Sequence, residues 1–427
     1  MKFHSTKDRS QLVLASEAMQ IGLAADNGLF VPEYFPQINW QAFSDQMKYP
    51  QFAAKVLAPF FENDILSYQL DEVCNEAFNF EIPLKKLDKN NLVLELFHGP
   101  TLSFKDIGAR FLAGCLSRIQ SEKTFTILVA TSGDTGSAVA AAFHKKPNIR
   151  VIVMYPEGKI SLRQQKQITC WGDNILAVAV KGRFDDCQKL VKAAFTDNYW
   201  YERTALNTAN SINIGRLLPQ STYYAYTSWQ YYCSTGKGAN FIVPSGNVGN
   251  ISAAFWAKQM GFPIDEIILA QNANNVIGDY VVTGKYQPRN SIETLANAMD
   301  VGKPSNFERL AYLYPDYANF IDEIKVFKAD DKGITDTIIS VYDQYHETIC
   351  PHTATGFYAR AHLNKEKPYI MVATAHPAKF EQIIEPILNQ VIPPTEQLNT
   401  LLKRKHFNMT IDSDMQNLIQ ADKAYFG

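Results

Sequence analysis

The chain has 427 residues, 46% of them apolar, and its 41 Lys and Arg against 43 Asp and Glu give a net charge of −2. This length suits two or three domains or one large α/β unit, and the average glycine and proline content excludes collagen-like and low-complexity sequences. Because there is no basic excess, neither a nucleic acid nor a membrane is expected as a partner, and an anionic ligand must be held by a local site.

The N-terminal 90 residues are mixed and aromatic-rich, with turn signals at residues 26–28 and at Pro32 but no catalytic spacing. The first residues are charged, and no apolar stretch follows them, so they do not resemble a secretory signal. Six cysteines, none in a CxxC pair or at a zinc spacing, predict reduced thiols and a cytoplasmic protein without a metal site.

From residue 91 onward, short apolar runs alternate with helical patterns. Strands are expected at residues 125–130, 151–154, 175–180, 241–243, 267–270 and 369–373, all rich in Val and Ile as in strands covered on both faces. The alternation predicts an α/β fold with two open, mostly parallel sheets flanked by helices, which bind ligands at the carboxyl ends of their strands.

The helical patterns include residues 184–195, residues 335–345 after a candidate cap at Thr335, and residues 380–388, which Pro386 should kink or shorten. Two further windows, 124–143 and 238–257, nearly lack charge. Glycines and polar residues interrupt both windows, so each is predicted to be a strand, a loop and a helix rather than a membrane span.

Lys105 stands in the motif HGPTLSFKD at the start of a predicted helix, among apolar neighbours. Desolvation and the positive end of the helix dipole both lower the pKa of a lysine, and the neutral amine is the nucleophile. The position suits a lysine that forms a Schiff base. An ordinary solvated lysine paired with Asp106 would give the same pattern.

Two glycine-containing turns follow predicted strands: TSGDTG at 131–136 and PSGNVGN at 244–250. Small residues there expose the backbone N–H groups of a helix start to an anion. The second turn is neither a Walker loop nor GxGxxG and carries no charge, so its backbone would bind a phosphate. The first suits a carboxylate or a phosphate, and a well-capped turn needs the same residues.

A further segment, NSINIGR at 210–216, ends on Arg216, whose fork of donors suits a phosphate; a capped surface helix is the alternative. The segment TAHPAKF at 374–380 places Thr374 and His376 at a strand end. A core hydroxyl and a satisfied core histidine would look the same there.

Taken together and in this order, the five motifs resemble those of the threonine synthase family, pyridoxal 5′-phosphate enzymes of the tryptophan-synthase-β-like fold (fold type II). The resemblance covers nearly the whole chain and includes GLFVP at 28–32. The first and last motifs separate this family from the cysteine synthases and dehydratases of the same fold.

The resemblance implies conversion of O-phospho-L-homoserine and water to L-threonine and phosphate, by γ-elimination and β-addition of water. It also implies an N-terminal accessory domain (1–90), a catalytic region of two α/β lobes (91–390, smaller lobe about 125–215) and peripheral helices (391–427). The sequence does not indicate an oligomeric state.

The same resemblance implies the site residues. Lys105 is expected to form the Schiff base and to move protons at Cα, Cβ and Cγ of the substrate. The cofactor is expected to contact Lys105, Asp134, Ser245, Gly246, Asn247, Val248, Gly249, Asn250 and Thr374, the last at its pyridine nitrogen. The substrate carboxylate is expected at Ser132 and Thr135, and its phosphate at Asn210, Ser211 and Arg216.

Asp134 departs from much of this fold, in which an asparagine stands beside the 3′-oxygen of the cofactor. A carboxylate would repel that phenolate oxygen, so we expect Asp134 either to turn away or to share a proton.

Three alternatives stay open. A phospho-amino-acid lyase of the same fold would form a 2-oxo acid instead of threonine. A non-catalytic binder is disfavoured because Lys105 stands in an intact motif. A nucleotide-dependent enzyme is disfavoured because GxxxxGK and GxGxxG are absent, and the absence of HExxH leaves a zinc peptidase without support.

Overall fold

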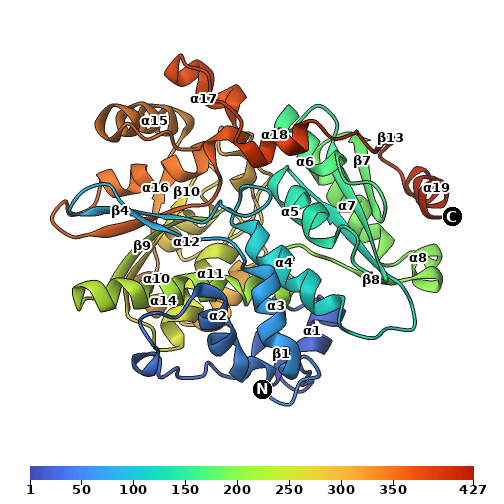
Figure 1. Ribbon diagram of the computed structural model, residues 1–427, viewed down its shortest axis with the longest axis horizontal. Helices are drawn as coiled ribbons and strands as arrows, with labels where there is room; N and C mark the ends of the chain where they lie inside the picture. Colours follow the sequence, from blue (N-terminus) through green and yellow to red (C-terminus); the bar gives the residue numbers. More distant parts are fainter.

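The computed structural model describes residues 1–427 and contains one small and two large sheets (Figure 1). The six-stranded sheet consists of β3 (Leu84–Lys86), β4 (Asn91–Glu95), β9 (Ala239–Pro244), β10 (Ile264–Gln271), β11 (Lys325–Lys328) and β12 (Tyr369–Ala373). The five-stranded sheet consists of β5 (Phe125–Ala130), β6 (Ile149–Pro156), β7 (Ile175–Lys181), β8 (Ala205–Asn207) and β13 (Asn408–Asp412). The small sheet pairs β1 (Phe3–Ser5) with β2 (Phe30–Pro32).

Helices surround the sheets. The helices that begin before residue 200 are α1 (Ala15–Ile21), α2 (Tyr49–Leu57), α3 (Leu70–Ala77), α4 (Lys105–Leu116), α5 (Asp134–Phe143), α6 (Leu162–Thr169), α7 (Phe184–Ala194) and α8 (Asn198–Arg203). The next are α9 (Ile214–Leu217), α10 (Gln220–Thr235), α11 (Gly249–Gln259), α12 (Val276–Thr283), α13 (Phe307–Leu313) and α14 (Tyr317–Glu323). The last are α15 (Asp331–Tyr345), α16 (Pro351–Ala361), α17 (Glu381–Leu388), α18 (Glu396–Leu402) and α19 (Met415–Phe426). Short 3₁₀ turns lie at η1 (Trp40–Ala42), η2 (Ala58–Phe61), η3 (Ser67–Gln69), η4 (Asn297–Met299) and η5 (Pro377–Lys379).

All six predicted strands are present, and the predicted α/β fold with two mostly parallel sheets is confirmed. The strand orders are β11-β10-β9-β12-β4-β3 and β13-β7-β6-β5-β8, and the only antiparallel pair within them is β3 with β4. Every residue of β5, β9 and β12 is buried, as expected for strands covered by helices on both faces. The two charge-poor windows form β5–loop–α5 and β9–loop–α11, and no helix is long and apolar enough to cross a membrane.

The two ends of the chain differ from the expectation. The tail does not consist of helices alone, because β13 pairs in parallel with β7 and completes an edge of the five-stranded sheet. The N-terminal region, at the bottom of Figure 1, has no core of its own, because Phe3 and Phe52 belong to the same apolar cluster as Phe111 and Ile127 of the catalytic region. Apolar packing therefore joins this region to the sheets.

Candidate active site

One cavity of about 3070 Å³ lies at the carboxyl ends of β5, β9 and β12. Residues from every predicted motif line it, including all predicted site residues except Val248: Lys105, Ser132, Asp134, Thr135, Asn210, Ser211, Arg216, Ser245, Gly246, Asn247, Gly249, Asn250 and Thr374. Its size exceeds that of common small-ligand pockets, roughly 300–1,000 Å³. The cavity therefore has room for a cofactor and a substrate together.

Lys105 is the first residue of α4, and its side chain is 17% exposed. Burial lowers the pKa of Lys105 to about 8; Asp134 opposes this shift, and the positive charges of Lys379 and Arg216 add to it. About a tenth of the amine is therefore neutral near pH 7, far more than for an ordinary lysine, and the neutral form is what a nucleophile or general base requires.

The backbone around Lys105 is fixed by the segment that follows β12. The N–H of Phe104 donates to the carbonyl oxygen of Thr374 at 2.9 Å, and the N–H of His376 donates to that of Leu102 at 3.0 Å. Asp106 accepts from both the N–H and the hydroxyl of Thr101, at 2.9 and 2.7 Å, and so closes the turn before the helix. The first and last motifs thus form one unit that aims Lys105 into the cavity.

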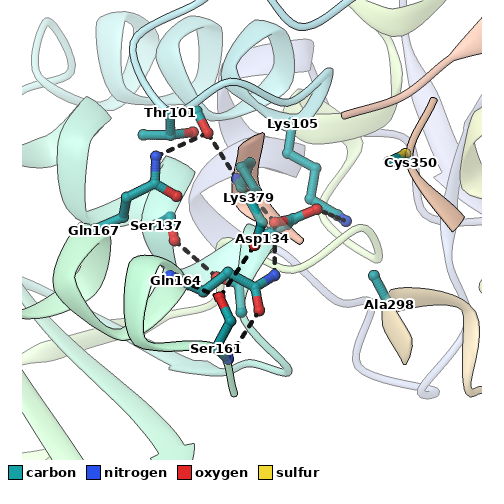
Figure 2. A network of polar contacts seen from close by, with 12 residues as sticks. Thr101, Lys105, Asp134, Ser137, Ser161, Gln164, Gln167, Ala298, Cys350 and Lys379 are labelled. Atoms are coloured by element: carbon teal, nitrogen blue, oxygen red, sulfur yellow. Dashed lines mark hydrogen bonds and ion pairs between the residues drawn. The ribbon is translucent and has the colours of Figure 1, made fainter. Parts of the chain in front are cut away.

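Asp134, the first residue of α5, lies at the centre of a polar cluster (Figure 2). Its Oδ1 lies 2.8 Å from Lys379 Nζ and accepts from Gln164 Nε2 at 3.0 Å, while its Oδ2 lies 4.0 Å from Lys105 Nζ. Burial raises the pKa of Asp134, but the cations Lys379 and Lys105 outweigh burial and hold the pKa well below its usual range. The carboxylate is therefore ionised, with Lys379 as its nearest counterion, an arrangement that the sequence did not suggest.

The turn after β9 forms a cradle of free backbone donors. The N–H groups of residues 246–250 donate to no acceptor within the protein. A side chain at Gly246 would place its Cβ 2.5 Å from Met299 Cα, so only glycine fits against η4 there. Val248 has φ +49° and a fully buried side chain, which turns the backbone rather than the side chain toward the cavity. Such a nest at the start of α11 suits a phosphate.

A second anion-binding group lies at residues 210–216. Arg216 on α9 is only 2% exposed, and it forms no ion pair with a carboxylate at contact distance, although Asp106 acts on it from farther away. Its Nη1 donates to the carbonyl oxygen of Ala209, but its Nε makes no hydrogen bond in the protein. Burial lowers the pKa of Arg216 to about 10, which leaves the guanidinium charged. A buried cation without a counterion costs free energy, and an anionic ligand would remove that cost.

Ser211 connects this group to the cradle. Its Oγ accepts from Asn247 Nδ2 at 2.6 Å and from Asn306 Nδ2 at 3.1 Å. Its backbone carbonyl accepts from Arg309, a fully buried arginine that also donates to Ile212 and, across the chain, to Phe30 in β2. The N-terminal region therefore helps to hold the 210–212 loop in place.

The remaining predicted residues differ in how many hydrogen bonds their side chains make within the protein and in how exposed they are. Asn250 Oδ1 accepts from the hydroxyls of Tyr223 and Tyr224, and its Nδ2 donates to the carbonyl oxygen of Pro244 at 3.5 Å, whereas its backbone N–H is free for a ligand. Thr374 directly follows β12 and is 6% exposed at the cavity wall. Ser132 and Thr135 are half-buried at the cavity on either side of Asp134.

Sequence reasoning missed several residues that build the site: Gln164, Asn306, Arg309, His352 and Lys379. Lys379 lies inside the motif TAHPAKF, where its position between Ala378 and Phe380 indicates a buried lysine. His352 Nε2 accepts from the N–H of Ala298 at 3.1 Å, and burial lowers the pKa of His352 to about 4. No local pattern marked Gln164, which comes from α6 and caps that helix together with Ser161.

The residues fit pyridoxal phosphate on chemical grounds. The aldehyde of that cofactor needs an amine, its phosphate needs a nest of donors, and its ring nitrogen needs a polar partner. One cavity supplies Lys105, the free N–H groups of residues 246–250, and the hydroxyl of Thr374.

Comparisons with known proteins agree with this chemistry. Residues 81–374 match the family described as pyridoxal-phosphate dependent enzyme, residues 2–78 match threonine synthase N terminus, and residues 353–421 match threonine synthase, C-terminal. The threonine synthase of Haemophilus influenzae is 37% identical over 430 residues, covering 100% of this chain and 99% of the relative.

Two solved structures are also similar over their whole length. The crystal structure of threonine synthase from Escherichia coli has a TM-score of 0.92 at 36% identity, covering 99% of this chain and 100% of that one. The structure of PLP-bound threonine synthase from Brucella melitensis has a TM-score of 0.91 at 32% identity, covering 100% and 99%.

Proposed function

This chain belongs to the threonine synthase family of pyridoxal-phosphate-dependent enzymes, and from that premise we propose that it converts O-phospho-L-homoserine and water to L-threonine and phosphate. Its activity is that of a threonine synthase, and its cofactor is pyridoxal 5′-phosphate. The observation that supports this substrate assignment is the presence of two separate anion sites in one cavity. The cradle at 246–250 suits the cofactor phosphate, and the uncompensated Arg216 beside Ser211 suits a phosphate on the substrate.

When bound, pyridoxal phosphate supplies an electron sink that stabilises negative charge developing beside the substrate amino group. Lys105, the N–H groups of residues 246–250 and the hydroxyl of Thr374 would hold the cofactor, with Thr374 toward its ring nitrogen. A hydroxyl partner would leave that nitrogen largely unprotonated, which would make accurate placement of Lys105 more important.

Lys105 Nζ is the group that moves protons. Its lowered pKa, about 8, suits an amine that takes a proton from Cα of the substrate and exchanges protons at Cβ and Cγ. Asn210, Ser211 and Arg216 hold the phosphate while its bond to Cγ breaks, and Ser132 and Thr135 bind the carboxylate. The phosphate group both binds the substrate to the enzyme and departs as the leaving group. These phosphate-binding residues therefore act in the ground state and in the transition state.

Two further features complete the proposal. All six cysteines are free and five are buried, which suits a reducing compartment such as the cytoplasm. The reacting partner is a small molecule, and the lining of the cavity provides the donors for its two anionic groups.

Product analysis tests the proposal. The purified holoenzyme is incubated with O-phospho-L-homoserine, and phosphate, threonine and 2-oxo acid are measured in parallel. We expect phosphate and threonine in equal amounts, with loss of both in Lys105→Ala and retention in Lys86→Ala, an exposed lysine of β3. Phosphate accompanied by a 2-oxo acid would instead identify a lyase.

A further inference from the structure

Lys379, the last residue of η5, is a fully buried lysine whose ammonium group contacts Asp134, a residue of the cavity lining. Its Nζ lies 2.8 Å from Asp134 Oδ1 and donates to the carbonyl oxygen of Thr101 at 2.6 Å. A buried ammonium group is costly unless it is paired and hydrogen-bonded, and here both conditions are met. Figure 2 shows Lys379 and Lys105 reaching Asp134 from different elements.

The two lysines do not share Asp134 equally. Lys379 forms the shorter ion pair, 2.8 Å against 4.0 Å for Lys105, and Gln164 supplies a third contact at 3.0 Å. Since the attraction between charges grows as they approach, Lys379 compensates most of the negative charge of Asp134. The remaining attraction between Asp134 and Lys105 is correspondingly weak.

We propose that Lys379 is a positioning residue that neutralises Asp134 and thereby keeps this carboxylate from trapping Lys105 as an ammonium ion. The inference rests on the proposed role of Lys105 as the cofactor lysine. A carboxylate paired internally with an ammonium group carries about the same net charge as an amide. The Asp134–Lys379 pair therefore gives this position about the same net charge as the asparagine that other members of the fold carry there.

The other titratable groups near this cluster come from three elements. Arg216 faces it from α9, His352 and Cys350 face it from the start of α16, and Asp106 lies behind it on α4. Burial lowers the pKa of His352 to about 4 and raises the pKa of the Cys350 thiol, so both are uncharged near neutral pH. The charges that act directly on Lys105 are thus Asp134, Lys379 and Arg216.

A charge cycle tests the proposal in the full-length chain without cofactor. The pH dependence of reductive methylation at residue 105, followed by mass spectrometry, gives the pKa of Lys105 independently of catalysis. Lys379→Met should raise this pKa, and Asp134→Asn should lower it, each by about one unit or more, the usual effect of a charge a few ångströms away. The variant carrying both substitutions should return close to the wild-type value.

Lys166→Met is the matched control, because Lys166 is a buried lysine on α6 that donates to a backbone carbonyl, that of Arg404, outside the cavity. It should leave the pKa of Lys105 unchanged. If Lys379→Met fails to fold, Asp134→Asn is compared with the double variant, in which both members of the Asp134–Lys379 ion pair are removed together. The double variant should then show the higher pKa of the two.

An unchanged pKa of Lys105 in these comparisons would assign Lys379 to holding Thr101 only and would overturn the proposal. A holoenzyme readout separates this outcome from failure of the proposed function. After borohydride reduction, the pyridoxyl group must be found on Lys105 in the wild type; its presence on another lysine would refute the role of Lys105, whatever the charge cycle shows.

Discussion

Asn247 Nδ2 donates to Ser211 Oγ at 2.6 Å, and this hydrogen bond joins the proposed cofactor-phosphate cradle to the proposed substrate-phosphate loop. Asn306 Nδ2 donates to the same oxygen at 3.1 Å. A serine hydroxyl has two acceptor sites and one donor, so both acceptor sites of Ser211 are filled. The hydroxyl hydrogen of Ser211 is therefore free to donate to a ligand. Because this hydroxyl can only donate, it suits an acceptor such as an anionic oxygen.

Ser211→Ala therefore should weaken substrate binding. A hydrogen bond to a charged group contributes about 1.5–3 kcal/mol, so kcat/KM for O-phospho-L-homoserine should fall roughly 10- to 100-fold. Steady-state phosphate release measures the change. Ser234→Ala, which removes a serine hydroxyl of α10 outside the cavity, is the control, and an equal loss in both variants would contradict the assignment.

Arg216→Met should separate activity from stability. Loss of an oriented charged donor typically costs about 10²–10³ in rate, so kcat/KM should fall by that order. The melting temperature should stay within a few degrees, because the substitution removes a buried cation that has an unpartnered Nε and no carboxylate in ion-pair contact. A variant that unfolds early yet keeps its kcat/KM would show that Arg216 is a structural residue.

Gly246→Ala tests the cradle. The new Cβ would lie 2.5 Å from Met299 Cα and 2.7 Å from its carbonyl oxygen, so the backbone must shift and its N–H groups must move with it. Pyridoxal phosphate should bind at least about tenfold more weakly, given the 1.5–3 kcal/mol of each charged hydrogen bond. Fluorescence titration of the cofactor-free protein gives the Kd.

Gly356→Ala on α16 is the matched substitution. Its Cβ would meet its nearest neighbour, Pro244 Cγ, at 3.5 Å, which is ordinary contact, and alanine is the better helix former. Cofactor affinity should be unchanged. Equal weakening by both glycine substitutions would contradict a specific phosphate cradle.

His352 should make stability fall in acid. Its folded-state pKa, about 4, lies below the ordinary value of 6.5, so the unfolded chain binds more protons as pH falls through this window. The stability it contributes is present above about pH 6.5 and is lost toward pH 4, at up to about 1.4 kcal/mol per pH unit. Urea unfolding of the cofactor-free protein at several pH values measures this slope.

His352→Gln keeps a hydrogen-bond acceptor for Ala298 and should flatten the slope. His376, whose pKa burial also lowers to about 4, remains in both proteins, so the difference between them isolates His352. His362→Gln, at the exposed C-cap of the same helix, should leave the slope as it is. A slope that His352→Gln does not change would contradict the prediction.

The local sequence pattern was sufficient to predict the central strands, but it did not predict the edge strands. β5 and β12 have the predicted bounds because they are continuous apolar runs between turn signals. β11 (KVFK) and β13 (NMTID) are edge strands with polar, partly exposed residues, so their composition does not distinguish them from loops. Edge pairing is set by the neighbouring strand and not by the segment itself.

Helix ends show a similar limit. Thr335 was expected to cap the helix that begins near it, but Asp330 is the cap, and its side chain accepts from the N–H of Gly333. The first turn of α15 is polar and exposed, so the apolar periodicity begins one turn after the helix does. Thr335 lies inside the helix and donates to the carbonyl oxygen of Asp331.

The motifs predicted which residues meet at the cavity, because the carboxyl ends of parallel strands converge. They could not predict side-chain partners that are distant in sequence. Asp134 begins α5 and Lys379 ends η5, so the ion pair joins two elements far apart in the chain, and the two alternatives expected for Asp134 did not include such a partner. Asn250 has the right chemistry for a ligand, but two tyrosines of α10 occupy its side chain.

The most direct test of this account is to locate the cofactor on the chain. The holoenzyme is reduced with borohydride and digested, and the modified peptide is sequenced by mass spectrometry. The account predicts one pyridoxyl group, on Lys105. Attachment to any other lysine, Lys379 included, or no attachment at all, would contradict it.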